Sequence, residues 1–283
     1  MDIQYNSKCY TFEKNTYPSG LLDSFIDATY IIHLKDNGRL DHILEQLKEY
    51  QPTSTIYIAH NKGFKKCDKK LIEQASYQDL TDAFLQCFKH ADSQGYNNIL
   101  ILEDDFIFSS DIKNPGHINS IRQFVLSKEG DDFIYYLGCV PIFIIPKSVG
   151  SHYLSLKSLT THAIIYSKKA RSKITDFSGK HWDVIVEKNI GSRYLYYKPL
   201  CYQTFPETEN KKEWADKDNG VITWIKNAFI KSLSLDKEAE WGFAFLYILS
   251  KLILLVLIIL IVFIIYLILH RIVRKNKIFR KYI

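Results

Sequence analysis

Cysteine is scarce in this chain, and its cysteines form no recognisable pattern. There are five, an odd number, widely spaced and without a C-x-x-C pair. We interpret all five as reduced thiols in the core or in loops, which favours a reducing compartment. The sequence also lacks an N-x-[ST] sequon, which points in the same direction. The cysteines are Cys9, Cys67, Cys87, Cys139 and Cys201.

The first 240 residues lack an excess of positive charge. The whole chain carries a formal charge of +6, but seven of its 37 basic residues and none of its 31 acidic ones lie in 241–283. That leaves 30 basic and 31 acidic residues in 1–240. A nearly neutral globular part without a basic stripe argues against a nucleic-acid-binding protein.

One long apolar run stands out near the C-terminus. Eighteen apolar residues follow one another from Leu252 to Leu269, and the apolar stretch reaches back to Gly242. Because a membrane-spanning helix needs ~20 apolar residues, we predict a transmembrane helix over 242–269. The basic tail at 270–283 is suited to anionic lipid headgroups. No run near Met1 resembles a signal peptide.

The sequence gives conflicting signals about the side of the membrane on which the soluble part lies. Six Lys and Arg residues after Leu269 would keep the tail in the cytosol, with the soluble part on the other side. Five unpaired cysteines and the lack of a signal peptide favour the cytosolic face instead. We expect a single-pass protein with a C-terminal anchor and its soluble domain on the cytosolic face.

Apolar periodicity predicts alternating strands and helices in the first hundred residues. Strands are expected at 29–34, 54–60 and 98–102, and helices at 40–47 and 80–91. This alternation is typical of an α/β fold with a mostly parallel central sheet flanked by helices. Ligands bind such sheets beyond the carboxyl ends of the strands. Further helices are expected at 117–127 and 168–176, and further strands at 133–137, 161–167 and 195–203.

Three consecutive carboxylates, Glu103, Asp104 and Asp105, follow the strand at 98–102. Acids crowded at the end of an apolar strand repel one another and lose hydration. A helix N-cap or a solvated turn is one explanation. The other is a divalent cation, because Mg²⁺ and Mn²⁺ prefer carboxylate oxygens and need one or two of them plus substrate phosphates. Alternation along the chain puts Glu103 and Asp105 on one face and Asp104 on the other.

The acidic stretch ILILEDD (99–105) follows a Gly95-Tyr96 turn and occurs with five other stretches in a fixed order. Together they resemble glycosyltransferase family 25 over roughly 29–205. The sequence departs from the family pattern at Thr160, where the family has Gly, and at 79–88, which lacks the family's Gly and His. The other stretches are TYIIHLKDNGRLDHILEQL, DDFIYYLG, TTHAIIYSKKA, HWDVIVEKNI and YYKPLCYQ.

The resemblance implies a GT-A-like fold and an inverting transfer of a hexose. The donor would be a nucleotide sugar, a UDP-hexose, and the acceptor a hydroxyl group of a glycan, lipid or protein. Asp105 is the favoured direct ligand of Mn²⁺ or Mg²⁺. Glu103 or Asp104 would contact the donor ribose or the waters of the metal. His162 is a further candidate metal or phosphate contact, unless it is a hydrogen-bonded strand histidine.

Asp183 is the candidate general base. An inverting transfer needs a carboxylate that takes the proton of the acceptor hydroxyl, but Asp183 is equally suited to cap the helix that follows. Arg39 is a candidate contact of the donor diphosphate or a solvated turn charge. His33, like Tyr30, is a candidate neighbour of the nucleobase, with core packing as the alternative for Tyr30.

The expected layout divides the chain into five parts. Two rival functions stay open: a glycosyltransferase-like binding domain without turnover, and a metal-dependent phosphoryl-transfer enzyme or nuclease. The second is disfavoured by the missing basic surface and Gly-rich phosphate loop. The parts are an irregular segment at 1–26, a glycosyltransferase domain at 27–205, a stalk or peripheral helix at 206–240, the transmembrane helix at 242–269 and the tail at 270–283.

Overall fold

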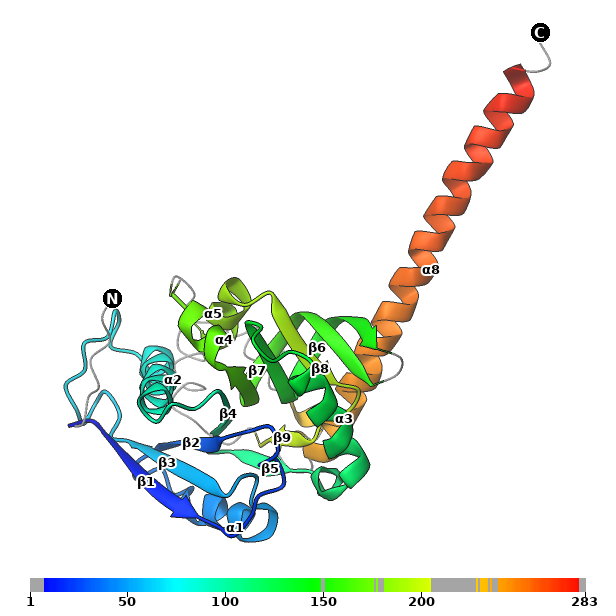
Figure 1. Cartoon of the computed structure of the whole chain (residues 1–283). Coiled ribbons are helices and arrows are strands. Elements are labelled where there is room, and N and C mark those ends of the chain that lie inside the picture. The colour runs from blue at the N-terminus through cyan, green and yellow to red at the C-terminus, as the bar shows by residue number, and fades with distance from the viewer. Residues whose placement is uncertain are drawn as a thin grey trace.

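The computed structural model describes residues 8–148, 151–175, 177, 181–204, 228, 230–233, 235 and 239–279. Most of the predicted stalk at 206–240 lies outside these residues. Figure 1 shows a central sheet flanked by helices, with one long helix leaving the domain at the C-terminal end. The chain therefore has the predicted α/β architecture with a C-terminal apolar helix.

The main sheet has seven strands in the order β1-β3-β2-β4-β7-β6-β8. These are β1 (Tyr10–Thr16), β2 (Ala28–Leu34), β3 (Thr55–Asn61), β4 (Asn98–Glu103), β6 (Phe133–Ser148), β7 (His152–Ser167) and β8 (Ser192–Tyr196). A small antiparallel sheet pairs β5 (Phe106–Phe108) with β9 (Cys201–Gln203). The helices are α1 (Leu40–Tyr50), α2 (Ser76–Ser93), the 3-10 helix η1 (Ser110–Lys113), α3 (Pro115–Leu126), α4 (Lys168–Lys173), α5 (Trp182–Asn189) and α8 (Ala239–Phe279).

The sheet is mixed, and the prediction of a mostly parallel sheet was wrong beyond its first half. Strands β3, β2 and β4 run parallel, as predicted from the strand and helix alternation. Strand β7 then pairs antiparallel with both β4 and β6. Strands β6 and β7 form one long hairpin, and no crossover helix separates them. Antiparallel strands need only such a tight connection.

The predicted irregular segment at 1–26 contains a strand. Strand β1 pairs antiparallel with β3 and forms the edge of the sheet. Its residues Tyr10 and Phe12 pack into the core, whereas the intervening side chains are polar. Period-two alternation is the strand signal, and the Pro18–Gly20 turn that follows hid it. The predicted strand at 195–203 is likewise divided into β8 and β9, with Pro199 between them.

The prediction of five unpaired cysteines was also wrong. Cys9, just before β1, forms a disulfide with Cys67 in the loop after β3. The other three cysteines are buried thiols. A pair 58 residues apart cannot be recognised from spacing, because pairing depends on how the fold brings the two Cα atoms together. The disulfide fastens the N-terminal strand to the domain.

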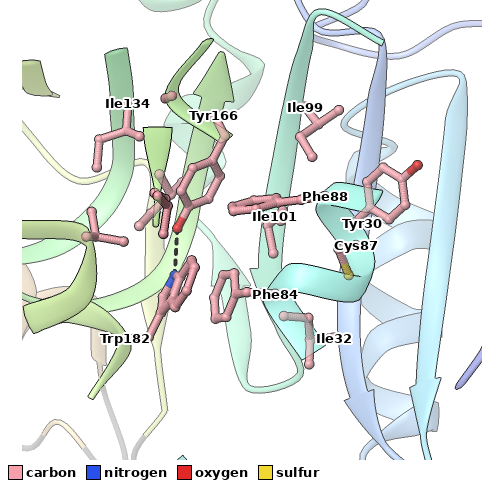
Figure 2. Packing of buried hydrophobic residues seen from close by; sticks show 14 of the residues in the cluster. Tyr30, Ile32, Phe84, Cys87, Phe88, Ile99, Ile101, Ile134, Tyr166 and Trp182 are labelled. Carbon is pink, nitrogen blue, oxygen red and sulfur yellow. Dashed lines mark hydrogen bonds between the residues drawn. The ribbon is translucent and has the colours of Figure 1, made fainter. Parts of the chain in front are cut away.

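One face of the sheet is covered by α2, α4 and α5. Figure 2 shows Phe84 and Phe88 of α2 on the side of the indole of Trp182, and Cys87 on the side of Tyr30 and Ile32. The Trp182 indole stacks on Phe84 with ring centroids 4.5 Å apart, and its N–H donates to the Tyr166 hydroxyl over 2.9 Å. These contacts fix the start of α5, and with it the neighbouring Asp183.

The opposite face is covered by α1 and α3, through Ile43, Leu47, Ile121 and Val125. The first turns of α8 pack against β6 and β9. Beyond them α8 extends away from the domain without touching it (Figure 1). Among the described residues, α8 is the one helix that is long and apolar enough to cross a membrane, over Ala239–Val273, and its most apolar part is not buried.

Candidate functional site

The three acids lie at the carboxyl edge of β2 and β4. Because these strands are parallel and Ile32 pairs with Glu103, the residues that follow both strands meet at the same edge. Glu103 is the last residue of β4, and Asp104 and Asp105 form the turn into β5. The three acids therefore lie at the end of a strand, where the sequence placed them.

Asp104 is held by the loop after β2. Its Oδ2 accepts hydrogen bonds from the backbone N–H of Leu34 over 3.1 Å and from the Asn37 amide over 2.5 Å. Its Oδ1 pairs with the guanidinium of Arg39. The structure thus brings Arg39 and Asp104 together, as two of the predicted donor contacts, and pairs them with each other. This ion pair orders the turn between β2 and α1.

Asp105 is a buried carboxylate with one unused oxygen. Its Oδ2 accepts a hydrogen bond from the Gln203 amide of β9 over 3.0 Å. Its Oδ1 is buried and has no hydrogen-bond partner among the described residues. Burial raises the pKa of Asp105 well above its usual range, and the carboxylates of Glu103 and Asp104 raise it further. A buried oxygen without a partner costs free energy, so this position is poised for a cation or a proton.

Glu103 lies beside Asp105, and its carboxylate is likewise crowded by neighbouring acids. Its Oε1 accepts a hydrogen bond from the Thr161 hydroxyl of β7 over 2.8 Å. Burial raises the pKa of Glu103 to about 7; the Thr161 hydrogen bond opposes the rise, and the nearby carboxylates of Asp104 and Asp183 add to it. The preceding Thr160 has a left-handed backbone with φ of 64°. This explains why glycine suits that position, since a β-branched residue is disfavoured there.

Asp183 is in the first turn of α5 and close enough to Glu103 to raise its pKa. The N-cap position belongs to His181, not to Asp183. The Oδ1 of Asp183 accepts a hydrogen bond from the N–H of Val184 over 2.8 Å. The fold therefore brings the candidate base to the acidic cluster from a helix about 80 residues further along the chain.

His33 stands at the end of β2 and is linked to the surface through two other side chains. Its Nδ1 lies 2.9 Å from the Nδ1 of His60 on β3, whose Nε2 lies 3.0 Å from Glu13 on β1. The Nε2 of His33 is buried and has no hydrogen-bond partner among the described residues. Burial lowers the pKa of His33. Tyr30, the other candidate neighbour of the nucleobase, is a fully buried core residue that stacks on Tyr57.

His162 has the surroundings of a packed strand histidine. It is fully buried, its Nε2 lies 3.2 Å from the carbonyl oxygen of Cys201, and its ring meets the edge of Phe243 from α8. Burial lowers the pKa of His162 to about 4. A Cβ on Gly138 would come within 2.4 Å of the imidazole, so Gly138 makes room for it. Its Nδ1 has no partner within the described part of the chain.

Three polar residues of the site had not been selected from the sequence. Asn37 holds Asp104, Thr161 holds Glu103, and Gln203 holds Asp105. Asn37 follows β2 and Gln203 ends β9, whereas Thr161 lies within β7. A polar residue at a strand terminus is the signal that would have selected Asn37 and Gln203, but not Thr161. Gln203 also has a buried Oε1 without a partner in the described residues.

A ready-made metal site is not present in the described part of the chain. There, no group of three or more His, Cys, Asp and Glu side chains is arranged to hold an ion. What the site offers is a set of oxygen atoms from Glu103, Asp105 and Gln203. Mg²⁺ and Mn²⁺ favour oxygen ligands and commonly use few from the protein. The donor set fits such an ion once substrate phosphates and water complete the shell.

Comparison with known proteins leaves the family open. No family model matches the chain, and no curated protein matches it. The solved structures that are similar to it include the A197 protein from STIV and a candidate glucose-1-phosphate thymidylyltransferase from Bacillus anthracis in complex with a sucrose. The first has a TM-score of 0.35 and 9% identity, covering 64% of this chain and 86% of the other. The second has a TM-score of 0.31 and 14% identity, covering 67% and 76%. Likeness at this level assigns no family, so function has to be inferred from the chain's own residues.

Proposed function

We propose that the protein is a membrane-anchored glycosyltransferase of GT-A-like fold. It would move a hexose from a nucleotide-sugar donor, a UDP-hexose, to a glycan, lipid or protein hydroxyl with inversion. The observation that carries this proposal is the crowding of Glu103 and Asp105, with Asp183 close by, at the carboxyl edge of the parallel strands. The resemblance to glycosyltransferase family 25 supports it as part of the same proposal.

A divalent cation relieves the crowding. Asp105 would hold Mn²⁺ or Mg²⁺ through its unpartnered Oδ1, and Glu103 would supply a second carboxylate. When bound, such an ion neutralises charge that develops on a leaving diphosphate. We leave His162 out of the metal shell, because the Cys201 carbonyl and the Phe243 ring already enclose it.

The chain's own residues have separate roles in this proposal. Asp183 does not cap α5, since His181 holds the N-cap position. In this proposal its carboxylate takes the proton of the acceptor hydroxyl as that oxygen attacks the anomeric carbon. Arg39 pairs with Asp104 and keeps the β2–α1 turn in place, which presents the guanidinium at the donor side of the site. His33 borders the same edge and offers its Nε2 to the donor.

A binding domain without turnover is the competing proposal, and one observation favours it. Asp104 already has three donors, from Leu34, Asn37 and Arg39. This leaves fewer carboxylate oxygens for a metal than three neighbouring acids suggest. A glycan-binding domain of this kind would use the same edge of the sheet without a cation.

Calorimetry separates the two proposals. UDP with Mn²⁺ should bind the full chain in nanodiscs, and binding should be lost when Mn²⁺ is chelated or Asp105 is changed to Asn. Asp131→Asn is the matched control, because Asp131 is exposed and precedes β6, at the opposite edge of the sheet from the three acids. Binding of UDP that ignores both Mn²⁺ and Asp105 would refute the catalytic proposal. Hydrolysis of UDP-glucose, UDP-galactose and related donors would then identify the sugar.

We further propose that α8 anchors the domain on the non-cytosolic side of a membrane. The expectation of a cytosolic domain depended on five unpaired cysteines and on the lack of a signal peptide, and Cys9 and Cys67 are in fact bonded. Disulfides persist in oxidising compartments, and the basic residues after Leu269 favour a cytosolic tail. Protease treatment of sealed vesicles tests this: the domain should be shielded, and its digestion would overturn the assignment.

A further inference from the structure

The α8 helix changes character at Lys251. Before it, Phe243, Leu246 and Tyr247 are buried against the domain. After it, from Leu255 to Val273, the large apolar side chains are exposed. The proposed membrane anchor is therefore continuous with a helical segment packed on the domain, and the helix leaves the protein surface over residues 251–254.

Lys251 also contacts the domain at the position where α8 leaves it. Its Nζ donates a hydrogen bond to the carbonyl oxygen of Tyr197 over 2.7 Å. The same ammonium group lies 5.4 Å from the ring centre of Tyr197 and 5.9 Å from that of Tyr153. Tyrosine and lysine are the residues that sit at the headgroup level of a bilayer.

The far end of the β6–β7 hairpin lies at the same level. Cys139 of β6 is 3.7 Å from the Tyr247 hydroxyl, and further along the hairpin Tyr153, which pairs with Pro146, reaches Lys251. This end of the hairpin carries apolar side chains that the domain does not cover. Phe143 is 43% exposed and Ile145 is 42% exposed.

Exposed aromatic and aliphatic side chains beside an anchor helix call for a partner. We propose that the hairpin end and its neighbours form a membrane-contact surface, made by Phe143, Ile145, Lys147, Tyr153, Tyr197 and Lys251. Its partner is the phospholipid bilayer that α8 crosses, so this inference rests on the proposed anchor. Phe143 and Ile145 enter the headgroup and acyl boundary, while the tyrosines and lysines stay among the headgroups.

The membrane-contact surface holds the domain in one orientation on the bilayer. A domain held by one helix alone could rotate and tilt about it, whereas a second contact fixes its orientation. The eighteen apolar residues from Leu252 to Leu269 then begin at the bilayer surface and span about 27 Å. The acidic site is thereby held close to acceptors that reside in, or emerge from, the membrane.

Depth measurements on the full chain in nanodiscs test the proposal. Single cysteines replace Phe143 and Leu44, which are both 43% exposed, and carry an NBD fluorophore. Native thiols do not compete, since Cys87, Cys139 and Cys201 are buried and Cys9 is bonded to Cys67. Nanodiscs contain phosphatidylcholine and phosphatidylglycerol, with doxyl-labelled lipid as the membrane quencher and iodide as the aqueous one.

The label at Phe143→Cys should be quenched by doxyl lipid and protected from iodide, and the label at Leu44→Cys should show the reverse. A label at Lys147→Cys, which leaves both apolar residues intact, should be quenched by doxyl lipid less strongly than the label at Phe143→Cys. A third label, at Val256→Cys, reports on the anchor alone. If Val256 is quenched by lipid while Phe143 behaves like Leu44, the contact surface is refuted and the anchor stands. If Val256 is reached by iodide, the anchor and the surface both fail.

Discussion

Replacing Glu103 with Gln should stabilise the free protein at neutral and alkaline pH. Gln keeps the acceptor for the Thr161 hydroxyl but removes a charge that burial disfavours. The folded state raises the pKa of Glu103 from 4.5 to about 7. A difference of this size corresponds to about 3 kcal/mol of folding free energy, because one pKa unit is worth ~1.4 kcal/mol.

The sign of the pH dependence follows from linkage. Because the folded pKa lies above the unfolded one, the folded chain binds the proton more tightly. Stability is therefore highest below about pH 4.5 as far as Glu103 is concerned, falls as the pH rises, and levels off above about 7. Glu103→Gln should match the wild type at the acid end and exceed it by about 3 kcal/mol at pH 8.

Urea unfolding of the full chain in micelles, followed by circular dichroism at several pH values, measures this difference. Glu129→Gln is the control, because Glu129 is exposed on the surface and its replacement should change little. Adding Mn²⁺ with UDP should stabilise the wild type more than Glu103→Gln, since the cation offsets the same repulsion. Equal stability of wild type and Glu103→Gln at pH 8 would refute the account of the crowded acids.

Three other changes have defined outcomes. Thr160→Gly should stabilise the fold by ~1 kcal/mol, because it relieves a left-handed β-branched residue; a lower melting temperature would contradict this. Cys67→Ser opens a loop of 58 residues and should cost about 4 kcal/mol, and a reductant should lower the melting temperature of the wild type but not of this variant. Asp183→Asn should leave UDP binding unchanged in calorimetry and slow hexose transfer by ~10²–10⁴-fold, whereas a near-normal rate would assign the base to another residue.

The strands and helices of the first half could be predicted because each has a strong local pattern. The apolar spacing of Ile43 and Leu47 indicates α1, and the apolar run of Ile and Leu before Glu103 indicates β4. The pairing of β7 between β4 and β6 could not be predicted, since an apolar strand that is buried on both faces reads the same in either direction. The disulfide was missed for the same reason: it depends on a contact that is distant in sequence.

The site shows a similar division between local and distant information. The position of Glu103, Asp104 and Asp105 follows from their place after a strand. Their individual roles do not, because each is determined by a partner elsewhere: Thr161 on β7, Asn37 before α1 and Gln203 on β9. Alternation places Glu103 and Asp105 apart from Asp104, and the structure agrees, since Asp104 alone is bound by the β2–α1 turn.

The central claim is that a divalent cation occupies the space beside Asp105. A crystal structure of the protein with Mn²⁺ and UDP, with anomalous diffraction recorded at the manganese edge, tests it directly. We predict an anomalous peak about 2 Å from the Oδ1 of Asp105, shared with the UDP phosphates. A UDP complex in which that oxygen contacts no metal, with manganese absent or bound elsewhere, would contradict the account.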